Sequence, residues 1–339
     1  MKILSTLSLG TGVAIAATAL LAATSGTASA VPAPIPSGSV VQIDVLPYTI
    51  NSPGTYCLAN SFLVFGPAGI VVEANGVTID LGGHELQGDG TGYGIRGTSS
   101  KFLNVRNGTV RGWDVGVQGG AQGNFSDLGI SECSYLGLHA GNSAVVERVH
   151  VTGASDRCVE TGPFSTVRDV VVDCLPGAGF GMLVNQGCTV EHVSITGANG
   201  GIFLNRGCSM RDSIVRKSAI VGVQCETGCL FESVVVEQSE DDGFVLVGNS
   251  VLRNCIARDC ASAGARVLGK GSVVEGNTLT SNALGLSVPS GHNKVTGNVA
   301  LENATDYAIG PLNQVGPILK DFMTITSTNP YANFATPLL

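Results

Sequence analysis

Residues 201–222 read GIFLNRGCSMRDSIVRKSAIVG, which is one full period of a repeat that runs through most of the chain. A glycine followed by an apolar residue returns every 21 residues from here to residue 285, and at intervals of 20 to 25 before it. A fixed period of this size is typical of a chain that winds one short unit repeatedly. The repeating positions are Gly69, Gly94, Gly116, Gly137, Cys158, Gly181, Gly201, Gly222, Gly243, Gly264 and Gly285, with cysteine once in place of glycine.

Each unit has the composition of short β-strands. Segments such as 190–195 (VEHVSI) and 234–236 (VVV) are rich in β-branched residues, and Gly, Asn, Ser or Asp cluster at their ends. No segment inside the repeat keeps a helical periodicity of 3.6 residues. Hairpins would also fit, but the regular period favours parallel winding, in which every unit hydrogen-bonds to its neighbours. We therefore predict an all-β solenoid of about eleven coils over residues 69–306.

One strand position alternates in charge through seven successive units. Opposite charges on opposed strand positions stabilise by about 0.2–1 kcal/mol, whereas like charges destabilise. We interpret this column as register control on a solvated face, and we expect neighbouring members to lie side by side. The members are Glu147, Arg168, Glu191, Arg211, Glu232, Arg253 and Glu275.

The N-terminus has the pattern of a secretory signal. Residues 1–30 contain a positive start at Lys2, an apolar stretch over 13–23 and the small residues Ala28-Ser29-Ala30. The apolar stretch is too short to span a membrane. We expect a secreted protein, extracellular or periplasmic, without a membrane span.

The two ends of the repeat need covers, because an open coil exposes its core and its strand edges. We predict a lead-in and N-terminal cap over 31–68 and a C-terminal cap over 307–339. Ile318, Phe322 and Phe334 are the residues expected to cover the last coil.

The overall composition restricts the partners. The formal net charge of -8 argues against nucleic acid and against anionic membranes. The five histidines are dispersed over different units, so we predict no metal site and no cofactor, with calcium at outward carboxylates as an alternative.

The ten cysteines allow disulfides in an oxidising compartment. Cys188, Cys208 and Cys229, however, occupy the same phase of three adjacent units, where parallel side chains are poorly oriented for bridging. We predict a stack of buried thiols there. Zinc at Cys225 and Cys229 would lack further ligands.

The segment 77–88 (VTIDLGGHELQG) resembles the opening coil of secreted bacterial right-handed parallel β-helix proteins of the pectate-lyase-like superfamily. The segments 47–58 (PYTINSPGTYCL) and 329–334 (NPYANF) are similar to the N-terminal cap and the C-terminal ending of the same group. The resemblance implies a right-handed parallel β-helix. It implies little about activity, because the superfamily includes lyases, hydrolases, tailspikes and adhesins.

A candidate site follows from the repeat. Two residues beyond each repeating position lies an outward column whose first members are all polar, and successive side chains are spaced by about 4.8 Å. A base, an acid and a cation on one rigid face suit a lyase acting on acidic sugars. The candidate catalytic residues are Arg96, His139 and Glu160; the candidate substrate-binding residues are Trp113, Gln118, Tyr135 and Arg157.

Other interpretations of these residues stay open. The polar column is equally typical of a solvated strand, and Trp113 of a ring packed under a loop. The segment 240–243 (EDDG) is similar to the paired carboxylates of superfamily hydrolases, but Gly291-His292-Asn293 lacks a glycine of their histidine motif.

We therefore weigh two functions. The favoured one is a secreted β-helix that binds extracellular polysaccharide or envelope glycan without catalysis, because units of 20–25 residues leave little chain to wall a cleft. The alternative is a polysaccharide lyase or glycoside hydrolase that acts on an acidic polysaccharide in the groove of the coil.

Overall fold

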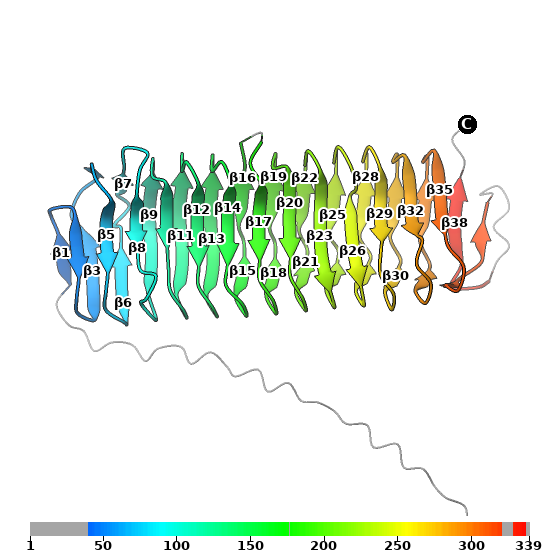
Figure 1. The fold of residues 1–339 in the computed structure, drawn as a ribbon, viewed down its shortest axis with the longest axis horizontal. Coiled ribbons are helices and arrows are strands. Elements are labelled where there is room, and N and C mark those ends of the chain that lie inside the picture. Colours follow the sequence, from blue (N-terminus) through cyan, green and yellow to red (C-terminus); the bar gives the residue numbers. More distant parts are fainter. Residues whose placement is uncertain (1–39, 176, 321–327, 337–339) are drawn as a thin grey trace, which may run out of the picture. The chain divides into compact units, whose positions relative to one another are not determined.

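The computed structural model describes residues 40–175, 177–320 and 328–336. Within these ranges the chain forms β-strands and no helix, and the strands wind into a right-handed parallel β-helix (Figure 1). The predicted signal peptide 1–30, the start of the lead-in and Phe322 lie outside the described residues. No helix among the described residues is long and apolar enough to cross a membrane.

One sheet contains one strand from every coil and has thirteen parallel strands in chain order. Its strands are β2 (Tyr48–Ile50), β5 (Ala68–Val72), β8 (Tyr93–Arg96), β10 (Val115–Gln118), β12 (Leu136–Ala140), β14 (Arg157–Thr161), β17 (Phe180–Val184), β20 (Gly200–Leu204), β23 (Val221–Thr227), β26 (Phe244–Gly248), β29 (Ala263–Val267), β32 (Leu284–Val288) and β35 (Thr305–Ile309). The predicted count of about eleven coils is therefore too low. The first and last strands, β2 and β35, lack the repeating glycine by which coils were counted.

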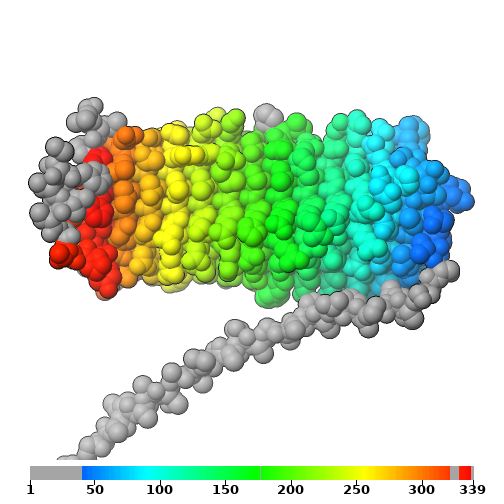
Figure 2. All heavy atoms as spheres, turned by 180° about the vertical axis from the view of Figure 1, so that it is seen from behind, coloured from blue at the N-terminus to red at the C-terminus, as the bar shows by residue number. Residues whose placement is uncertain are grey.

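The other strands form a sheet of twenty-five members that closes the remaining sides of each coil. They are β1 (Val41–Ile43), β3 (Gly54–Leu58), β4 (Phe62–Leu63), β6 (Val77–Asp80), β7 (Glu85–Gln87), β9 (Asn104–Arg111), β11 (Asn124–Ser131), β13 (Val145–Thr152), β15 (Thr166–Arg168), β16 (Val171–Asp173), β18 (Thr189–Glu191), β19 (Ser194–Thr196), β21 (Ser209–Arg211), β22 (Ile214–Arg216), β24 (Leu230–Glu232), β25 (Val235–Glu237), β27 (Val251–Arg253), β28 (Ile256–Arg258), β30 (Val273–Glu275), β31 (Thr278–Thr280), β33 (Lys294–Thr296), β34 (Val299–Leu301), β36 (Gln314–Val315), β37 (Ile318–Leu319) and β38 (Asn333–Thr336). Seen from behind, the atoms of consecutive coils form adjacent bands in chain order (Figure 2).

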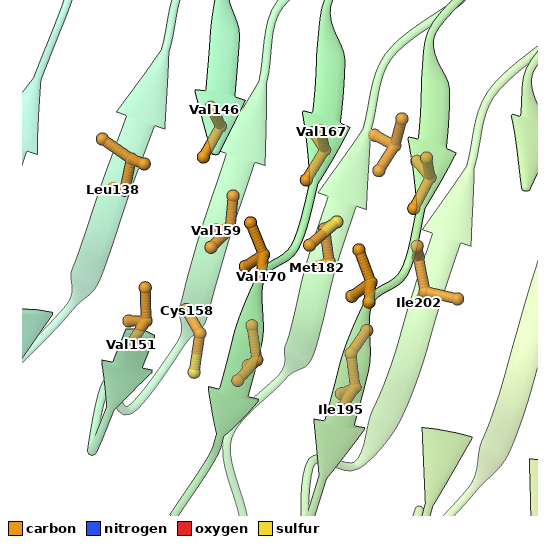
Figure 3. Close-up of a cluster of buried hydrophobic side chains, with 14 of the residues drawn as sticks. Leu138, Val146, Val151, Cys158, Val159, Val167, Val170, Met182, Ile195 and Ile202 are labelled. Carbon is orange, nitrogen blue, oxygen red and sulfur yellow. The ribbon is translucent and has the colours of Figure 1, made fainter. Parts of the chain in front are cut away.

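The core is a continuous column of aliphatic side chains between the two sheets. Val159 of β14, Val167 of β15 and Val172 of β16 are fully buried in one coil, and the next coils repeat the pattern. Figure 3 shows side chains from both sheets pointing toward one another, among them Leu138, Val146, Met182, Ile195 and Ile202. The strands bury Val, Ile and Leu at alternate positions, as a strand with one face on a core requires.

The repeating glycines have a steric cause. A Cβ added to Gly222 would lie 2.2 Å from Cγ1 of Val236 and 2.8 Å from the carbonyl oxygen of Gly243 in the next coil. The pairing of β10 with β12 joins Val115 to Leu136 and Val117 to Leu138 and skips the glycine between them. The bridge pattern is interrupted at the glycine of both strands, and backbone approaches backbone there.

The alternating charges lie side by side, as predicted. Glu191 pairs with Arg211 in the ladder, and Nε of Arg211 lies 3.3 Å from Oε1 of Glu191. The pairing of opposite signs continues through all seven members. A second column was not predicted: the nearly buried carboxylate of Glu237 lies between Arg216 of the preceding coil and Arg258 of the following one.

Buried asparagines form a further unpredicted column near the C-terminal coils. The side-chain Nδ2 of Asn277 donates to Oδ1 of Asn298 at 2.9 Å, and Nδ2 of Asn298 donates to Oδ1 of Asn333 at 3.1 Å. The backbone N–H of Asn277 donates to the same oxygen of Asn298 at 3.0 Å. The stack satisfies polar groups that burial would otherwise leave unpaired.

Substitution of Gly222 tests the steric cause. We expect Gly222→Ala to lower the free energy of unfolding by about 1–3 kcal/mol, because the added methyl overpacks the contact with Val236. Gly129→Ala is the matched control, since its Cβ would meet no atom closer than 3.5 Å. Denaturant unfolding of both variants checks this, and equal stability of the two would contradict it.

Glu237 gives the fold a dependence on pH. Hydrogen bonding from Arg216 and Arg258 outweighs burial and holds the pKa of the Glu237 carboxyl below its ordinary value. A lowered pKa stabilises the fold above the unfolded-state value, and the stabilisation is lost as the pH falls through the folded-state pKa.

We therefore expect Glu237→Gln to lower the free energy of unfolding by about 1–3 kcal/mol at pH 7. The deficit relative to the unsubstituted protein should shrink as the pH falls below the ordinary glutamate pKa of about 4.3 and through the lower folded-state pKa, where the native carboxyl becomes protonated as well. Thermal unfolding between pH 3 and pH 8 measures this, with the exposed Glu240→Gln as control. A deficit that does not change with pH would contradict the ion-pair explanation.

Candidate functional site

The predicted outward column exists on the thirteen-stranded sheet. Gln118 of β10 pairs with Arg96 of β8 on one side and with His139 of β12 on the other, and His139 pairs with Glu160 of β14. Beyond Glu160 the column becomes apolar, at Leu183. Parallel pairing therefore gives the polar side chains the strand-to-strand spacing on which the prediction depends.

A local change in the alternation of β14 brings a second residue to this face. In a regular strand, residues three apart point to opposite faces. Here the pairing of β14 skips Cys158, so that Arg157 and Glu160 both face outward. The Nη1 group of Arg157 donates to Oε2 of Glu160 at 2.7 Å.

Arg157 is the centre of a polar cluster. Its Nε donates to Oδ2 of Asp156 at 2.8 Å, and its Nη2 donates to the hydroxyl of Tyr135 at 2.6 Å. The guanidinium carbon lies 5.6 Å from the centre of the Tyr135 ring. Partial burial acts to lower the pKa of Arg157, but Asp156 and Glu160 outweigh burial and raise it above its ordinary value. The cluster fixes one cation between two carboxylates.

A pair of phenylalanines adjoins this cluster. Phe180 of β17 is the ladder partner of Arg157, and Phe203 of β20 belongs to the outward column. Their ring centres lie 5.8 Å apart with an interplanar angle of 60°. A Cβ added to Gly200 would lie 2.2 Å from Cε1 of Phe180, so the Phe180 ring lies over this glycine. Both rings are half-buried.

Sequence reasoning missed Phe180 as part of the site. Only the column two residues after the glycine was counted, whereas in β17 the residue before the glycine also faces outward. Position 180 carries this signal, because it has the same spacing from Gly181 as Arg157 has from Cys158.

The prediction that Trp113 stacks on a ligand is wrong. Its side chain is 0% exposed, and its indole Nε1 donates to the carbonyl oxygen of Leu86 at 3.1 Å. The ring packs against Gly69, Gly88 and Gly94, where a Cβ would meet it. Trp113 is therefore a core residue. Tyr135, in the corresponding turn of the next coil, is 43% exposed and available.

The three candidate catalytic residues do not converge. Arg96 lies three strands from Glu160, or about 14 Å along the sheet, and its guanidinium covers the ring of Tyr93 at 5.3 Å. His139 and Glu160 are neighbours, and Nδ1 of His139 is buried without a hydrogen-bond partner among the described residues. Oε1 of Gln118 accepts a hydrogen bond from the hydroxyl of Thr98 at 3.0 Å.

The paired carboxylates at 241 and 242 have different environments. Asp242 is buried, and its oxygens accept from Nε of Arg266 at 2.6 Å and from the N–H of Ala263 at 2.9 Å. Burial acts to raise the pKa of Asp242, but the hydrogen bonds outweigh it and lower the pKa. Asp241 is exposed. Asp242 anchors the neighbouring coil, which does not favour the hydrolase interpretation of this segment.

The described residues contain no candidate metal site, and the hollows described below lie away from the predicted site residues. Within the described ranges, no group of three or more His, Cys, Asp or Glu side chains is placed to hold a metal ion. The hollows that the structure describes lie along the C-terminal coils, lined by residues such as Lys294, Gln314 and Tyr331. None of these hollows is lined by a predicted site residue.

Comparison with known proteins identifies the same fold. Residues 205–311 match the family model of the right-handed β-helix region. None of the curated proteins compared with the chain matches it.

Three solved structures are similar. The A-module of mannuronan C-5 epimerase AlgE4 of Azotobacter vinelandii shares 14% identity over 84% of this chain and 87% of its own, with a TM-score of 0.54. The AlgE6 A-module of the same organism shares 11% identity over 74% of this chain and 82% of its own, with a TM-score of 0.53. An alginate lyase from Paenibacillus sp. str. FPU-7 shares 13% identity over 73% of this chain and 97% of its own, with a TM-score of 0.45. At such identities the first two likenesses establish the fold alone.

Proposed function

We propose that this β-helix is a secreted protein that binds polysaccharide on the outward face of the thirteen-stranded sheet, between β10 and β20. The observation that carries the proposal is the cluster around Arg157, where a cation, two carboxylates and the exposed Tyr135 meet. The adjoining rings of Phe180 and Phe203 extend it in the direction of the stacked coils. Polar groups for hydroxyls beside apolar rings for sugar faces are a suitable lining for a glycan.

The rigidity of the cluster favours binding. Strand pairing fixes the backbone of β12, β14 and β17, and three hydrogen bonds fix the Arg157 side chain. A ligand therefore meets groups that are already ordered, and less conformational entropy is lost on association. Two solved structures of the same fold are mannuronan C-5 epimerases, which is consistent with a polysaccharide as the ligand.

The charge balance of the cluster favours a neutral glycan. Asp156 and Glu160 both bond to Arg157, so the cluster carries one more negative than positive charge. A substrate carboxylate would compete with two carboxylates already held by the same guanidinium. Hydroxyl groups can instead donate to those carboxylates without displacing the arginine.

The alternative function is catalysis on an acidic polysaccharide. It is favoured by one observation: His139 lies beside Glu160, a pair of residue types that act as base and acid in proton transfer. The ion pair of Glu160 with Arg157 opposes it, because the carboxylate is engaged as an acceptor. In this alternative, His139 would remove a proton from the sugar and Arg157 would stabilise the developing negative charge.

Binding to a panel of neutral and acidic polysaccharides tests the proposal. We expect Arg157→Met and Phe180→Ala each to weaken binding to the best ligand by about tenfold or more, as loss of a central polar or aromatic contact does. Arg253→Met on the other sheet is the matched control and should bind as the unsubstituted chain does. Binding that survives both site substitutions would overturn the proposal.

The same samples separate the two functions. Absorbance of unsaturated products and the release of reducing ends report turnover. Turnover that is abolished by His139→Ala and Glu160→Gln would establish the catalytic alternative, and binding without turnover would support a binding protein.

A further inference from the structure

The repeating glycines face a second column, formed by the turn that precedes the next strand of the thirteen-stranded sheet. A Cβ on Gly116 would lie 3.0 Å from Sγ of Cys133, and a Cβ on Gly201 would lie 2.9 Å from Oγ of Ser218. The same relation holds between Gly243 and Cys260, at 3.1 Å. A glycine backbone therefore meets one side chain from a residue about 17 positions later.

One coil departs from this rule at the glycine position. The glycine is replaced by Cys158, and the facing turn residue is Cys174. The two sulfur atoms lie 2.9 Å apart. Cys158 is the one repeating position of the eleven that carries a side chain. The residue that faces it, Cys174, is also a thiol. A cysteine in the turn is found in other coils as well, at Cys133 and Cys260. The departure is the side chain at position 158, which brings two thiols together.

We propose that Cys158 and Cys174 form a disulfide when the protein meets a low-molecular-weight disulfide such as oxidised glutathione. The half-exposed Cys174 attacks one glutathione sulfur and releases the other as a thiol. Cys158 then attacks the mixed disulfide and releases the second glutathione. The two protein thiols lose two electrons and two protons, and the glutathione disulfide gains them as two thiols.

Bond formation requires little movement. The sulfurs must approach from 2.9 Å to about 2.05 Å, which side-chain rotation in the turn can supply. The stacked thiols of Cys208 and Cys229 differ, because each donates to a backbone carbonyl oxygen, of Asn185 at 3.0 Å and of Asn205 at 3.1 Å. Their side chains lie in the parallel arrangement that is unsuited to bridging.

The bond would join the two halves of the candidate site. Cys158 lies in β14 between Arg157 and Glu160, and Cys174 lies in the turn that leads to Phe180 of β17. The pairing itself does not depend on the proposed glycan function, so the two can fail independently.

Thiol counting on the full chain tests the proposal. Reduced protein, denatured under acid, should show ten titratable thiols, and protein exposed to oxidised glutathione should show eight. Peptide mapping without reductant should then give one linked pair containing Cys158 and Cys174. Linkage of other cysteines, or an unchanged count of ten, would overturn the proposal.

Two variants keep the test independent of folding defects. Cys158→Gly restores the residue found in the other coils, and Cys174→Ser places there the residue type found at 218 and 239. After oxidation Cys174→Ser should retain nine thiols, and Cys158→Gly should retain eight, because Cys174 then stops at the mixed disulfide with glutathione. Both should lose the rise in Tm of about 5 °C that we expect on oxidising the unsubstituted chain. Cys229→Ser should still lose two thiols. A loss of two thiols from Cys158→Gly would contradict the pairing.

Discussion

The stacking of most coils depends on a column of glycines at which the backbone has no room for a side chain. At Gly201 a Cβ would lie 2.4 Å from the carbonyl oxygen of the next glycine and 2.2 Å from Cγ1 of Val215. Carbonyl groups and branched core residues therefore fill the space that a side chain would need. The 21-residue period of the sequence is the period of this contact, and it is steric because these glycines have ordinary negative φ angles.

The same contact gives the protein its polar face. The residue before the repeating position and the residue two after it both face outward in β14 and β17, so the face gains a second column there. Arg157 and Glu160 can form an ion pair within one strand only for this reason. Asp242 and Arg266 use the same two columns in adjacent coils, where they hold one coil to the next.

Sequence patterns predicted those features that depend on repetition. The period predicted the parallel coil, and the alternating charges predicted that Glu191 lies beside Arg211. The coil number was underestimated because β2 and β35 form coils without the glycine. Trp113 was misplaced because a single aromatic residue in a turn has no repeat partner that reveals which way it points. Phe180 was missed because one outward column was counted where the strand has two.

The exception at Cys158 bears on how the polar cluster is held. The ten remaining repeating positions are glycines without a side chain, and strand pairing supports their neighbours in the sheet. The coil that begins with Arg157 also gathers Asp156, Glu160 and the hydroxyl of Tyr135 around one guanidinium, which concentrates charge on a single strand. It is in this strand that the chain places a side chain in the glycine column and a matching thiol opposite. A covalent link there would hold β14 against the turn that positions Phe180, so the most highly charged part of the face would also be the most firmly supported.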